Sequence, residues 1–454
     1  MDTTNLVRKY HVPAPRYTSY PTVPYWNTEP PTQKQWIESV QLSFDQSNET
    51  DGISLYIHLP FCENLCTYCG CNTRITKNHQ VEEPYIKSVL KEWDMYCEIL
   101  PTKPLIKEIH LGGGTPTFFN PENLQTLING ILSKANIHSD AEFSFEAHPN
   151  NTTAKHLQTL YGLGFKRLSL GIQDFDPKVQ FVINRMQSFE QVKLVTEQAR
   201  EIGYTSVNFD LIYGLPLQTL TGLEETIKKV SLLMPERIAF YSYAHVPWIK
   251  PGQRRYTEDH LPGIELKQEL YELGRKMFTD LDYEEIGMDH FALKTDTLCR
   301  AEQAGKLHRN FMGYTHNYTQ LMISLGVSSI SDTWFAFAQN VKKVEDYTEL
   351  IEQGVFPIFK GHILTPEDLF IRKHILALMC TGKTNWDQSS ALPSYFTEGL
   401  ERMQELAADG FVEINQTSLC VTPLGKRFLR NICMALDSRL YASQPATQLF
   451  SMAG

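Results

Sequence analysis

The chain has 454 residues, of which 42% are apolar, and a formal net charge of −10. This length is enough for two or three domains, or for one barrel of moderate size with appendages, and the apolar fraction indicates a folded core. No apolar run approaches the roughly twenty residues of a membrane helix, and the acidic balance argues against nonspecific nucleic-acid binding, which depends on Lys and Arg to neutralise phosphates.

The first fifty residues predict an extended arm. They are rich in Pro, Tyr and Thr, as in Pro15-Arg-Tyr-Thr-Ser-Tyr-Pro-Thr22, and show neither helical nor strand periodicity over a useful length. We therefore expect an N-terminal arm over residues 1–50, a central domain over 51–360 and a C-terminal domain over 361–454.

In the central domain, short β-branched runs alternate with amphipathic helical stretches. Strands are predicted near Ile53–His58, Ile106–Leu111, Glu142–Glu146, Arg167–Ile172, Ser206–Ile212 and Arg237–Tyr241. Such repetition indicates parallel strands joined by crossover helices, and six units form an incomplete barrel better than a closed eight-stranded one. The predicted fold class is α/β, an incomplete (β/α)6 barrel of the TIM type, with a doubly wound sheet as the alternative.

Four cysteines, Cys62, Cys66, Cys69 and Cys71, directly follow the first predicted strand. The first three have the spacing C-x3-C-x2-C. Thiolates placed this way on a short loop can hold three irons of a [4Fe–4S] cluster and leave the fourth iron without a protein ligand. This spacing suggests a cluster that binds and reductively cleaves S-adenosylmethionine, producing a radical.

Two other interpretations of these cysteines are a zinc knuckle, which also uses short thiolate spacings, and disulfides. Disulfides are the weaker alternative, because no basic and apolar signal segment opens the sequence and we expect a cytoplasmic protein with reduced thiols. The remaining cysteines are scattered and typical of small buried apolar residues, so we assign none of them to metal; they are Cys97, Cys299, Cys380, Cys420 and Cys433.

Unusual residues stand at the ends of the predicted strands. After the first strand and its cysteines, the strand ends carry in turn Gly112-Gly-Gly-Thr-Pro116, Glu146, Gln173 with Asp174, Asp210, and Tyr243-Ala-His245. In barrels, chemistry collects at the C-terminal edge of the strands. This convergence is hard to reconcile with a zinc knuckle.

Several of these residues have both a functional and a structural interpretation. The glycine turn lets backbone approach a ligand but is also typical of a tight turn. Glu146 could bind a ribose or ammonium group or be a surface carboxylate. Asp210 lies in an apolar run and should be paired or bound to a ligand, because burying a bare carboxylate is costly.

Arg185 could bind a carboxylate in fork geometry or form a surface salt bridge. His58 and His245 are each more typical of structural histidines, and we keep them as candidates that support the site from behind.

Beyond about residue 360 the pattern becomes helical, and Thr365-Pro-Glu-Asp368 is typical of a helix start. Leu400–Gly410 predicts a helix, and Phe411–Ile414 with Leu419–Pro423 predicts a hairpin that leads into a further helix, as in winged-helix domains. DNA binding is disfavoured by the acidic balance and by the absence of a basic recognition helix. We expect this domain to form a lid or wall over the barrel mouth.

With these residues assembled, the chain resembles the oxygen-independent coproporphyrinogen III oxidases of the radical S-adenosylmethionine superfamily nearly from end to end. The resemblance rests on Pro15-Arg-Tyr-Thr-Ser-Tyr-Pro-Thr22, Tyr56-Ile-His-Leu-Pro-Phe-Cys62, Cys69-Gly-Cys71, Gly112-Gly-Gly-Thr-Pro-Thr117, Asp210-Leu-Ile-Tyr-Gly-Leu-Pro216, Gly287-Met-Asp-His-Phe291, His308-Arg-Asn-Phe311 and Arg430-Asn-Ile-Cys-Met434. Related heme chaperones and heme-degrading methyltransferases share the barrel and the cluster loop but lack the full set.

The resemblance implies an oxidoreductase of heme biosynthesis that decarboxylates two propionates of coproporphyrinogen III to the vinyl groups of protoporphyrinogen IX without oxygen. Each decarboxylation would consume one S-adenosylmethionine through a 5′-deoxyadenosyl radical. The barrel would exclude water and hold the radical against one carbon. The alternative function is a heme-binding chaperone of the same superfamily.

The resemblance also implies site residues. The cluster ligands would be Cys62, Cys66 and Cys69, and the catalytic residues Cys71 and Tyr56. The first S-adenosylmethionine would contact Tyr56, Tyr68, Gly113, Gly114, Thr115, Glu146 and Ile330. A second S-adenosylmethionine would contact Gln173, Arg185, Asp210 and Ala244.

Three positions depart from the family pattern: Tyr68 stands where Phe is common, Met312 where Gln is expected and His148 where Asp is usual. Arg16 and Arg309 are candidates for propionate contacts, since Arg matches carboxylate geometry.

The resemblance implies a low-potential electron donor such as flavodoxin or ferredoxin as a partner. Both are usually acidic, so docking on this acidic chain requires a local basic patch. We expect a soluble monomer with no nucleic-acid or membrane partner.

Overall fold

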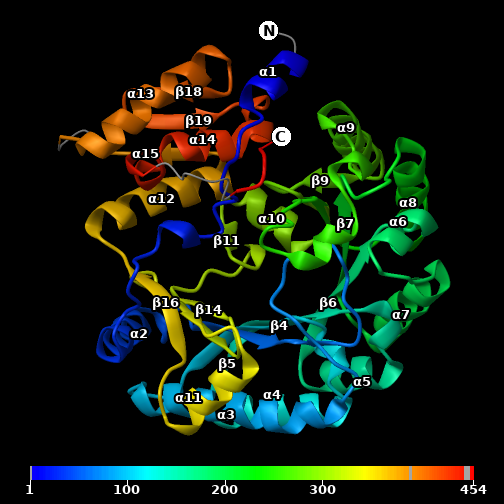
Figure 1. The fold of residues 1–454 in the computed structure, drawn as a ribbon. Helices are drawn as coiled ribbons and strands as arrows, with labels where there is room; N and C mark the ends of the chain where they lie inside the picture. Colours follow the sequence, from blue (N-terminus) through cyan, green and yellow to red (C-terminus); the bar gives the residue numbers. More distant parts are fainter. Residues whose placement is uncertain (1–2, 388–390, 444–449, 454) are drawn as a thin grey trace.

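The computed structural model describes residues 3–387, 391–443 and 450–453 (Figure 1). The predicted arm and C-terminal domain include residues 1–2, 388–390, 444–449 and 454, which lie outside this description. Six parallel strands form the centre of a sheet: β1 (Ile53–Leu59), β4 (Leu105–Gly113), β5 (Asn136–Ala147), β6 (Phe165–Gln173), β7 (Ser206–Tyr213) and β8 (Arg237–Ser242). The six predicted strands are confirmed.

The sheet continues beyond these six strands at both ends. Next to β1 lie the parallel strand β13 (Leu321–Leu325) and then, antiparallel, β14 (Ile330–Asp332), β15 (Ala336–Asn340) and β16 (Ile358–Ile363). Next to β8 lie β10 (His290–Leu293) and β9 (Tyr283–Glu285), both antiparallel to their neighbours. The seventh parallel strand, β13, was not predicted.

The order of the central strands decides between the two predicted folds. The six strands lie side by side in chain order, β1-β4-β5-β6-β7-β8. A doubly wound sheet reverses its strand order at a switch point, which places helices on both faces. Here every crossover runs in the same direction, so the helices cover one face and the sheet curls into an open arc. The incomplete barrel is therefore confirmed.

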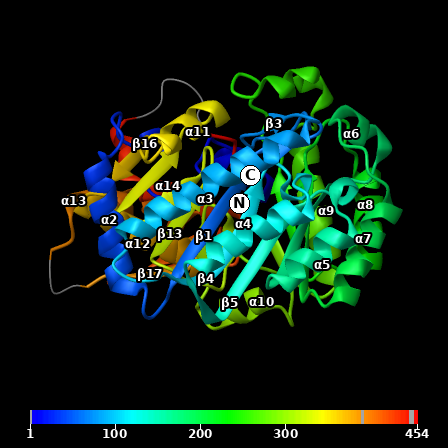
Figure 2. The same cartoon turned by 90° about the horizontal axis from the view of Figure 1, so that it is seen from below.

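The crossover helices lie along the convex side of the arc (Figure 1). They are α3 (Glu82–Ile99), α4 (Pro121–Ser133), α5 (Ala154–Gly162), α7 (Phe189–Ile202) and α8 (Leu220–Leu233). From below, α3 and α4 lie in front of strands β1, β4 and β5 (Figure 2). Helix α4 begins where the Asn120 side chain accepts a hydrogen bond from Asn123 N, with Pro121 at its first position.

Side chains alternate along each parallel strand between the helix layer and the interior of the arc. On β5 the fully buried Phe145 belongs to the main core and touches an interior cavity, which its polar neighbours Ser144 and Glu146 also line. Likewise on β7, Phe209 joins the core between the cavity-lining Asn208 and Asp210. The strands therefore present a polar interior near their C-terminal ends.

The remaining elements are shorter or lie outside this layer. They are α6 (Pro177–Val182), α9 (Ile264–Asp280), α10 (Thr297–Gln303), α11 (Val344–Glu352) and α15 (Ser438–Ala442), the strands β2 (Phe61–Cys62), β3 (Arg74–Ile75), β11 (His308–Asn310) and β12 (Gly313–Thr315), and the 3-10 helices η1 (Val23–Tyr25), η2 (His79–Val81), η3 (Pro116–Phe118), η4 (Pro149–Asn151), η5 (Pro251–Arg255), η6 (Glu258–His260) and η7 (Gly425–Phe428). Within the described residues, no helix is both long and apolar enough to cross a membrane.

The prediction of an extended arm without helical periodicity is wrong for much of residues 1–50. Two helices form there, α1 (Thr3–Tyr10) and α2 (Gln33–Ser47). Helix α2 begins with a capping box between Thr32 and Gln35. Its residues Trp36, Val40 and Phe44, spaced by four, are buried in the main core.

The predicted helix, hairpin and helix of the C-terminal part are confirmed. They correspond to α13 (Ser394–Ala408), the antiparallel pair β18 (Val412–Ile414) and β19 (Ser418–Val421), and α14 (Leu429–Ala435). Helix α12 (Pro366–Thr381) precedes them, and β17 (Lys383–Asn385) completes a three-stranded sheet. Leu6, Val7, Tyr17 and Tyr20 from the arm share the core of this part, so the start of the arm packs with the C-terminal elements.

We predict that Trp36→Ala lowers the free energy of unfolding by about 3–5 kcal/mol, through lost apolar burial and the cavity left behind. The indole is fully buried and donates a hydrogen bond to Tyr96 Oη at 3.1 Å. Urea unfolding followed by circular dichroism measures the change. Lys34→Ala on the same helix is the control, because that side chain is 84% exposed; equal midpoints for the two variants would show that α2 is not packed as described.

Candidate active site

The four clustered cysteines lie on the wall of one cavity of about 630 Å³, which we name the cysteine cavity. Its wall also contains Tyr68, Gly113, Gly114, Thr115, Glu146, Gln173, Arg185 and Asp210. In the part of the chain that the structure describes, no three His, Cys, Asp or Glu side chains converge closely enough to bind a single metal ion. A [4Fe–4S] cube differs, because its three thiolates bind three separate irons.

The thiols have polar neighbours that differ from one cysteine to the next. Cys62 Sγ lies 3.3 Å from Thr115 Oγ1, and Arg185 Nη1 donates to Cys66 Sγ at 3.6 Å. Burial raises the pKa of the Cys62 thiol to about 11. A hydrogen bond from Cys71 lowers the pKa of the Cys69 thiol to about 6, which favours its thiolate.

The glycine turn after β4 is fastened to the cysteine loop by backbone hydrogen bonds. Gly114 N donates to Leu59 O at 2.8 Å, and Thr115 N donates to Phe61 O at 3.0 Å. A Cβ on Gly114 would lie 2.6 Å from the Pro60 carbonyl group, closer than van der Waals contact allows. Only glycine permits this approach, and the turn therefore forms the cavity wall opposite the thiols.

Glu146, at the end of β5, is held by two donors. Its Oε2 accepts a hydrogen bond from Gly113 N at 3.2 Å, and its Oε1 lies 3.5 Å from His110 Nε2. Desolvation alone would raise the pKa of Glu146, but the hydrogen bonds and the charge of His110 outweigh it and keep the pKa below its usual value. The carboxylate is therefore ionised at neutral pH, while 44% of its side chain stays accessible.

Asp210, late in β7, also faces the cysteine cavity. Ser169 Oγ donates to one carboxylate oxygen at 3.0 Å and Asn208 Nδ2 to the other at 2.7 Å. Burial and the nearby charge of Glu146 raise the pKa of Asp210 to about 6. The carboxylate is therefore hydrogen-bonded rather than bare, and its binding to a ligand stays a prediction.

Gln173 and Arg185 close the same wall. Gln173 ends β6 with a φ of 67°, which is rare for a residue with a side chain and is typical of functional sites. Arg185 Nη2 donates to Gly171 O at 2.6 Å, so its guanidinium bridges β6 and the Cys66 thiol.

A second cavity of about 470 Å³, which we name the tyrosine cavity, shares Gly70, Cys71, Gly113 and Glu146 with the first. Tyr56 and Ile330 lie on its wall together with Phe311 and Met312. The residues expected at the first S-adenosylmethionine are therefore divided between two adjoining cavities.

His58 lies on the same wall, next to Tyr56, and not behind it as expected. Its Nε2 lies 2.9 Å from Asn72 O and must donate there, because a carbonyl only accepts. Burial lowers the pKa of His58, so the ring is neutral and its Nδ1 accepts from Tyr56 Oη at 3.1 Å. The ring thus connects Tyr56 to the residue that follows Cys71.

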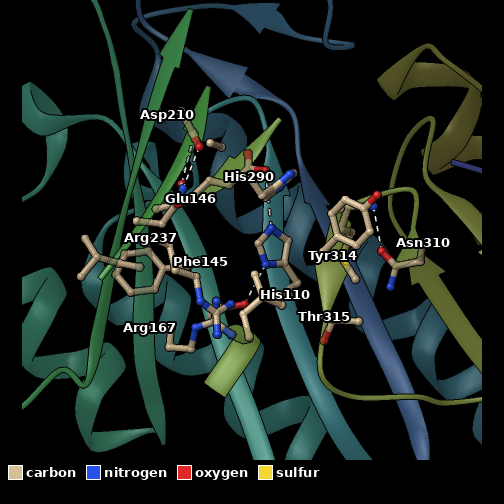
Figure 3. Close-up of a pocket in the computed structure, with 18 of the residues that line it drawn as sticks. His110, Phe145, Glu146, Arg167, Asp210, Arg237, His290, Asn310, Tyr314 and Thr315 are labelled. Carbon is tan, nitrogen blue, oxygen red and sulfur yellow. Dashed lines mark hydrogen bonds and ion pairs between the residues drawn. The ribbon is translucent and has the colours of Figure 1, made fainter. Parts of the chain in front are cut away.

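A smaller interior cavity of about 140 Å³ lies beneath the two carboxylates, and Figure 3 shows Glu146, Asp210 and His110 reaching into it from three different strands. Arg167 and Arg237 also line it. Each of these arginines is paired with an acid outside the cavity, Arg167 with Glu142 and Arg237 with Asp296.

Sequence reasoning missed His110, Ser144, Ser169 and Asn208, which hold the two carboxylates or the ring between them. For two of them the two-residue period of a strand was a usable signal. Ser144 precedes Glu146 by two positions, and Asn208 precedes Asp210 by two, so each faces the same side of its strand as the carboxylate.

Some expected residues do not reach the cavities. Asp174 is fully buried, with Gln218 Nε2 and Thr226 Oγ1 donating to its carboxylate at 2.7 and 2.8 Å, and it is a structural residue. Ala244 lies in the loop after β8 and is absent from both cavity walls, although Gln253 Nε2 donates to its carbonyl at 3.2 Å. His245 contacts Tyr243 Oη at 3.1 Å and also lies off both walls.

The expected lid is not formed by the C-terminal part. Of its described residues, none lines the cysteine or the tyrosine cavity. Its apolar faces instead pack with the start of the arm, and Tyr314 of β12 donates a hydrogen bond to Met379 O at 3.0 Å. These contacts join it to the arm and to the two-stranded sheet of β11 and β12.

The residues present fit the cofactors that the sequence suggests. Three thiols face one cavity, and Gly114 lets the turn come close to them without filling that space. Two carboxylates stand at the far wall, suited to hydroxyl and ammonium groups. The arrangement fits a cluster with an open iron and an adjacent polar ligand.

Comparisons with known proteins agree with this geometry. The family model described as "Radical SAM superfamily" matches residues 56–230. Two curated relatives carry the name oxygen-independent coproporphyrinogen III oxidase. That of Escherichia coli is 35% identical over 96% of this chain and 95% of its own length, and that of Synechocystis is 36% identical over 99% and 97%.

A solved structure described as coproporphyrinogen III oxidase (HemN) from Escherichia coli, a radical SAM enzyme, aligns with a TM-score of 0.88 at 34% identity. The alignment covers 96% of this chain and 98% of that one. The chain therefore belongs to the oxygen-independent coproporphyrinogen III oxidase family of the radical SAM superfamily.

Proposed function

We propose that this protein decarboxylates two propionates of coproporphyrinogen III to the vinyl groups of protoporphyrinogen IX in heme biosynthesis, without oxygen and with S-adenosylmethionine. The observation that carries the proposal is the cysteine cavity, because the three thiols, the glycine turn and the two carboxylates all line it. The names of the full-length relatives support the choice of substrate.

We assign Cys62, Cys66 and Cys69 as cluster ligands and Cys71 as a catalytic residue outside the ligand set. When bound, the cluster and S-adenosylmethionine would supply a one-electron cleavage that removes a hydrogen atom from the propionate chain. The propionate chain would lose that hydrogen atom, carbon dioxide and one further electron, which a one-electron acceptor outside the chain takes up, and the vinyl group remains. Tyr56, fixed by His58, would close the tyrosine cavity beside the reacting carbon and keep water out.

We further propose two S-adenosylmethionine sites. The first would use Tyr56, Tyr68, Gly113, Gly114, Thr115, Glu146 and Ile330, and the second Gln173, Arg185, Asp210 and Ala244. The shared wall of the two cavities at Gly113 and Glu146 supports the first site. The second site is supported by Asp210, Gln173 and Arg185, which line the cysteine cavity, whereas Ala244 does not line it.

We also propose that the protein is a monomer in the cytoplasm. Its electron donor would be a flavodoxin or a ferredoxin. The division into residues 1–50, 51–360 and 361–454 stays a prediction.

The direct test is an anaerobic assay of the cluster-reconstituted protein with coproporphyrinogen III, S-adenosylmethionine and dithionite. We expect protoporphyrinogen and 5′-deoxyadenosine to form together. Cys66→Ser should lose iron and activity, Cys71→Ser should keep iron but lose activity, and Cys97→Ser on α3 should keep both. Tight heme binding without any decarboxylation would instead support the chaperone function.

The second prediction concerns Asp210. The carboxylate is ionised above its raised pKa of about 6 and becomes protonated as the pH falls through that value. Binding of the second S-adenosylmethionine should therefore weaken below pH 6, and Asp210→Asn should abolish it at every pH while the first site still binds. Equilibrium dialysis against labelled S-adenosylmethionine measures both, with the exposed Asp140→Asn as control. Full binding by the Asn variant would contradict this assignment.

The third prediction concerns substrate carboxylates. Arg309 is 5% exposed, its guanidinium lies 4.5 Å from the Tyr314 ring, and its Nε and Nη1 have no hydrogen-bond partner within the described residues. Arg16 is already paired with Asp289 at 2.6 Å. We propose both as propionate contacts.

Arg309→Ala should raise KM for coproporphyrinogen III about tenfold, as expected for loss of a charge-assisted hydrogen bond, and Arg16→Ala should raise it less because the pair with Asp289 competes. Affinity for S-adenosylmethionine should not change, and the exposed Arg300→Ala provides a matched control. Unaltered substrate kinetics in both variants would refute these contacts.

A further inference from the structure

Exposed apolar side chains lie on two segments that are hydrogen-bonded to the cysteine loop. Phe181 is 66% exposed, Trp248 52% and Ile249 56%, and none of them lines the cysteine or the tyrosine cavity. Apolar groups left this open mark interaction surfaces when they are grouped and rimmed by polar residues. We name this surface the docking face; it consists of Phe181, Trp248 and Ile249 with the basic residues Lys178, Arg254 and Arg255.

Both segments of the docking face are fastened to the loop that carries the thiols. From the segment that contains Trp248 and η5, Gln253 Nε2 donates to Tyr68 O at 3.2 Å. From the turn after α6, Asn184 Nδ2 donates to Leu65 O at 2.7 Å. The docking face therefore lies on the two segments that hold the cysteine loop in place.

The local charge is opposite to that of the whole chain. Lys178, Arg254 and Arg255 are all exposed, and the Arg255 guanidinium lies 5.5 Å from the Phe181 ring. The nearest acids along the chain are Asp176, whose carboxylate accepts a hydrogen bond from Lys178 N, and the exposed Glu258 and Asp259 of η6. With Lys250, four cations therefore stand against three acids.

Lys250 adds a further positive charge between the docking face and the thiols, because its Nζ donates to Cys71 O at 3.2 Å. With a net charge of −10 over the chain, a basic surface at this place selects an acidic partner and steers its approach.

We propose that the docking face binds an acidic redox protein that delivers single electrons to the cluster. The inference rests on the proposed function, because each cleavage of S-adenosylmethionine consumes one electron that the chain does not itself supply. The donor is oxidised by one electron and the cluster is reduced by one. Electron transfer slows steeply with distance, so the donor must bind next to the thiols, and an apolar centre with a basic rim suits a weak, transient redox encounter.

The test uses reduced flavodoxin as the acidic donor and the cluster-reconstituted protein without porphyrinogen. The visible absorbance of the cluster reports its reduction in stopped flow. Lys178→Glu/Arg255→Glu should lower the second-order rate about tenfold at low salt, and added salt should slow the wild type more than the variant, because ions screen the attraction. Phe181→Ser should slow reduction without changing its salt dependence.

Lys103→Glu/Lys166→Glu is the matched control. It makes the same change in net charge at two exposed lysines that precede β4 and begin β6, at the opposite edge of the sheet. This control should keep the steep salt dependence of the wild type. Equal rates for the docking-face variant and the wild type would overturn the proposal.

A chemical reductant separates this inference from the proposed function. With dithionite, the docking-face variants should form 5′-deoxyadenosine at the wild-type rate, and an equal loss with both reductants would overturn docking. Absence of decarboxylation by the wild type with dithionite would refute the proposed function alone, since cluster reduction by flavodoxin is measured without substrate.

If Phe181→Ser changes the mass measured by light scattering, the face joins two copies of the chain and the proposal fails.

Discussion

The parallel pairing of β1 with β4 is the constraint on which the site depends. Its register sets Leu59 beside Gly113, so the cysteine loop and the glycine turn leave the sheet as neighbours. Their backbones approach so closely that a Cβ on Gly114 would meet the Pro60 carbonyl group. A side chain there would separate the thiols from the turn, and the two walls of the cysteine cavity would no longer face one another.

The remaining strands add to this cavity because they follow one another in chain order around the arc. Strands β5 and β7 then contribute inward-facing residues near their ends, Glu146 and Asp210, to the same interior. A sheet with reversed order would have placed these carboxylates on opposite sides of the cysteine loop. The strand order thus positions more residues of the site than any single hydrogen bond does.

The β-branched runs and the amphipathic stretches between them were enough to predict the six strands and the carboxylates at their ends. They were not enough for Asp174, because the pairing of β6 with β7 shifts between Gly171 and Gln173 and interrupts the alternation there. Gln173 turns into the cavity with a positive φ, and Asp174 turns into the core. Such a bulge depends on pairing with a neighbouring strand, which a single run of residues does not reveal.

The prediction of an extended arm failed at its two helices for different reasons. The four-residue spacing of Trp36, Val40 and Phe44 already indicates helix α2 in the sequence. The short helix α1 instead depends on packing against the C-terminal core, since eight residues form a helix poorly on their own. Arg430 strengthens this long-range contact by donating to the carbonyl groups of Ala14 and Met452, which no local pattern could indicate.

In the cysteine cavity, the positive charge of Arg185 and the negative charges of Glu146 and Asp210 form no ion pair with one another. Arg185 donates to a thiol and to a backbone carbonyl, and within the described residues it pairs with no acid. Glu146 and Asp210 likewise pair with no Lys or Arg there, and their mutual repulsion is part of the raised pKa of Asp210. The guanidinium therefore offsets negative charge at the thiols and leaves two carboxylates facing open space. A cationic ligand relieves that repulsion, and the sulfonium and ammonium groups of S-adenosylmethionine carry the required charge.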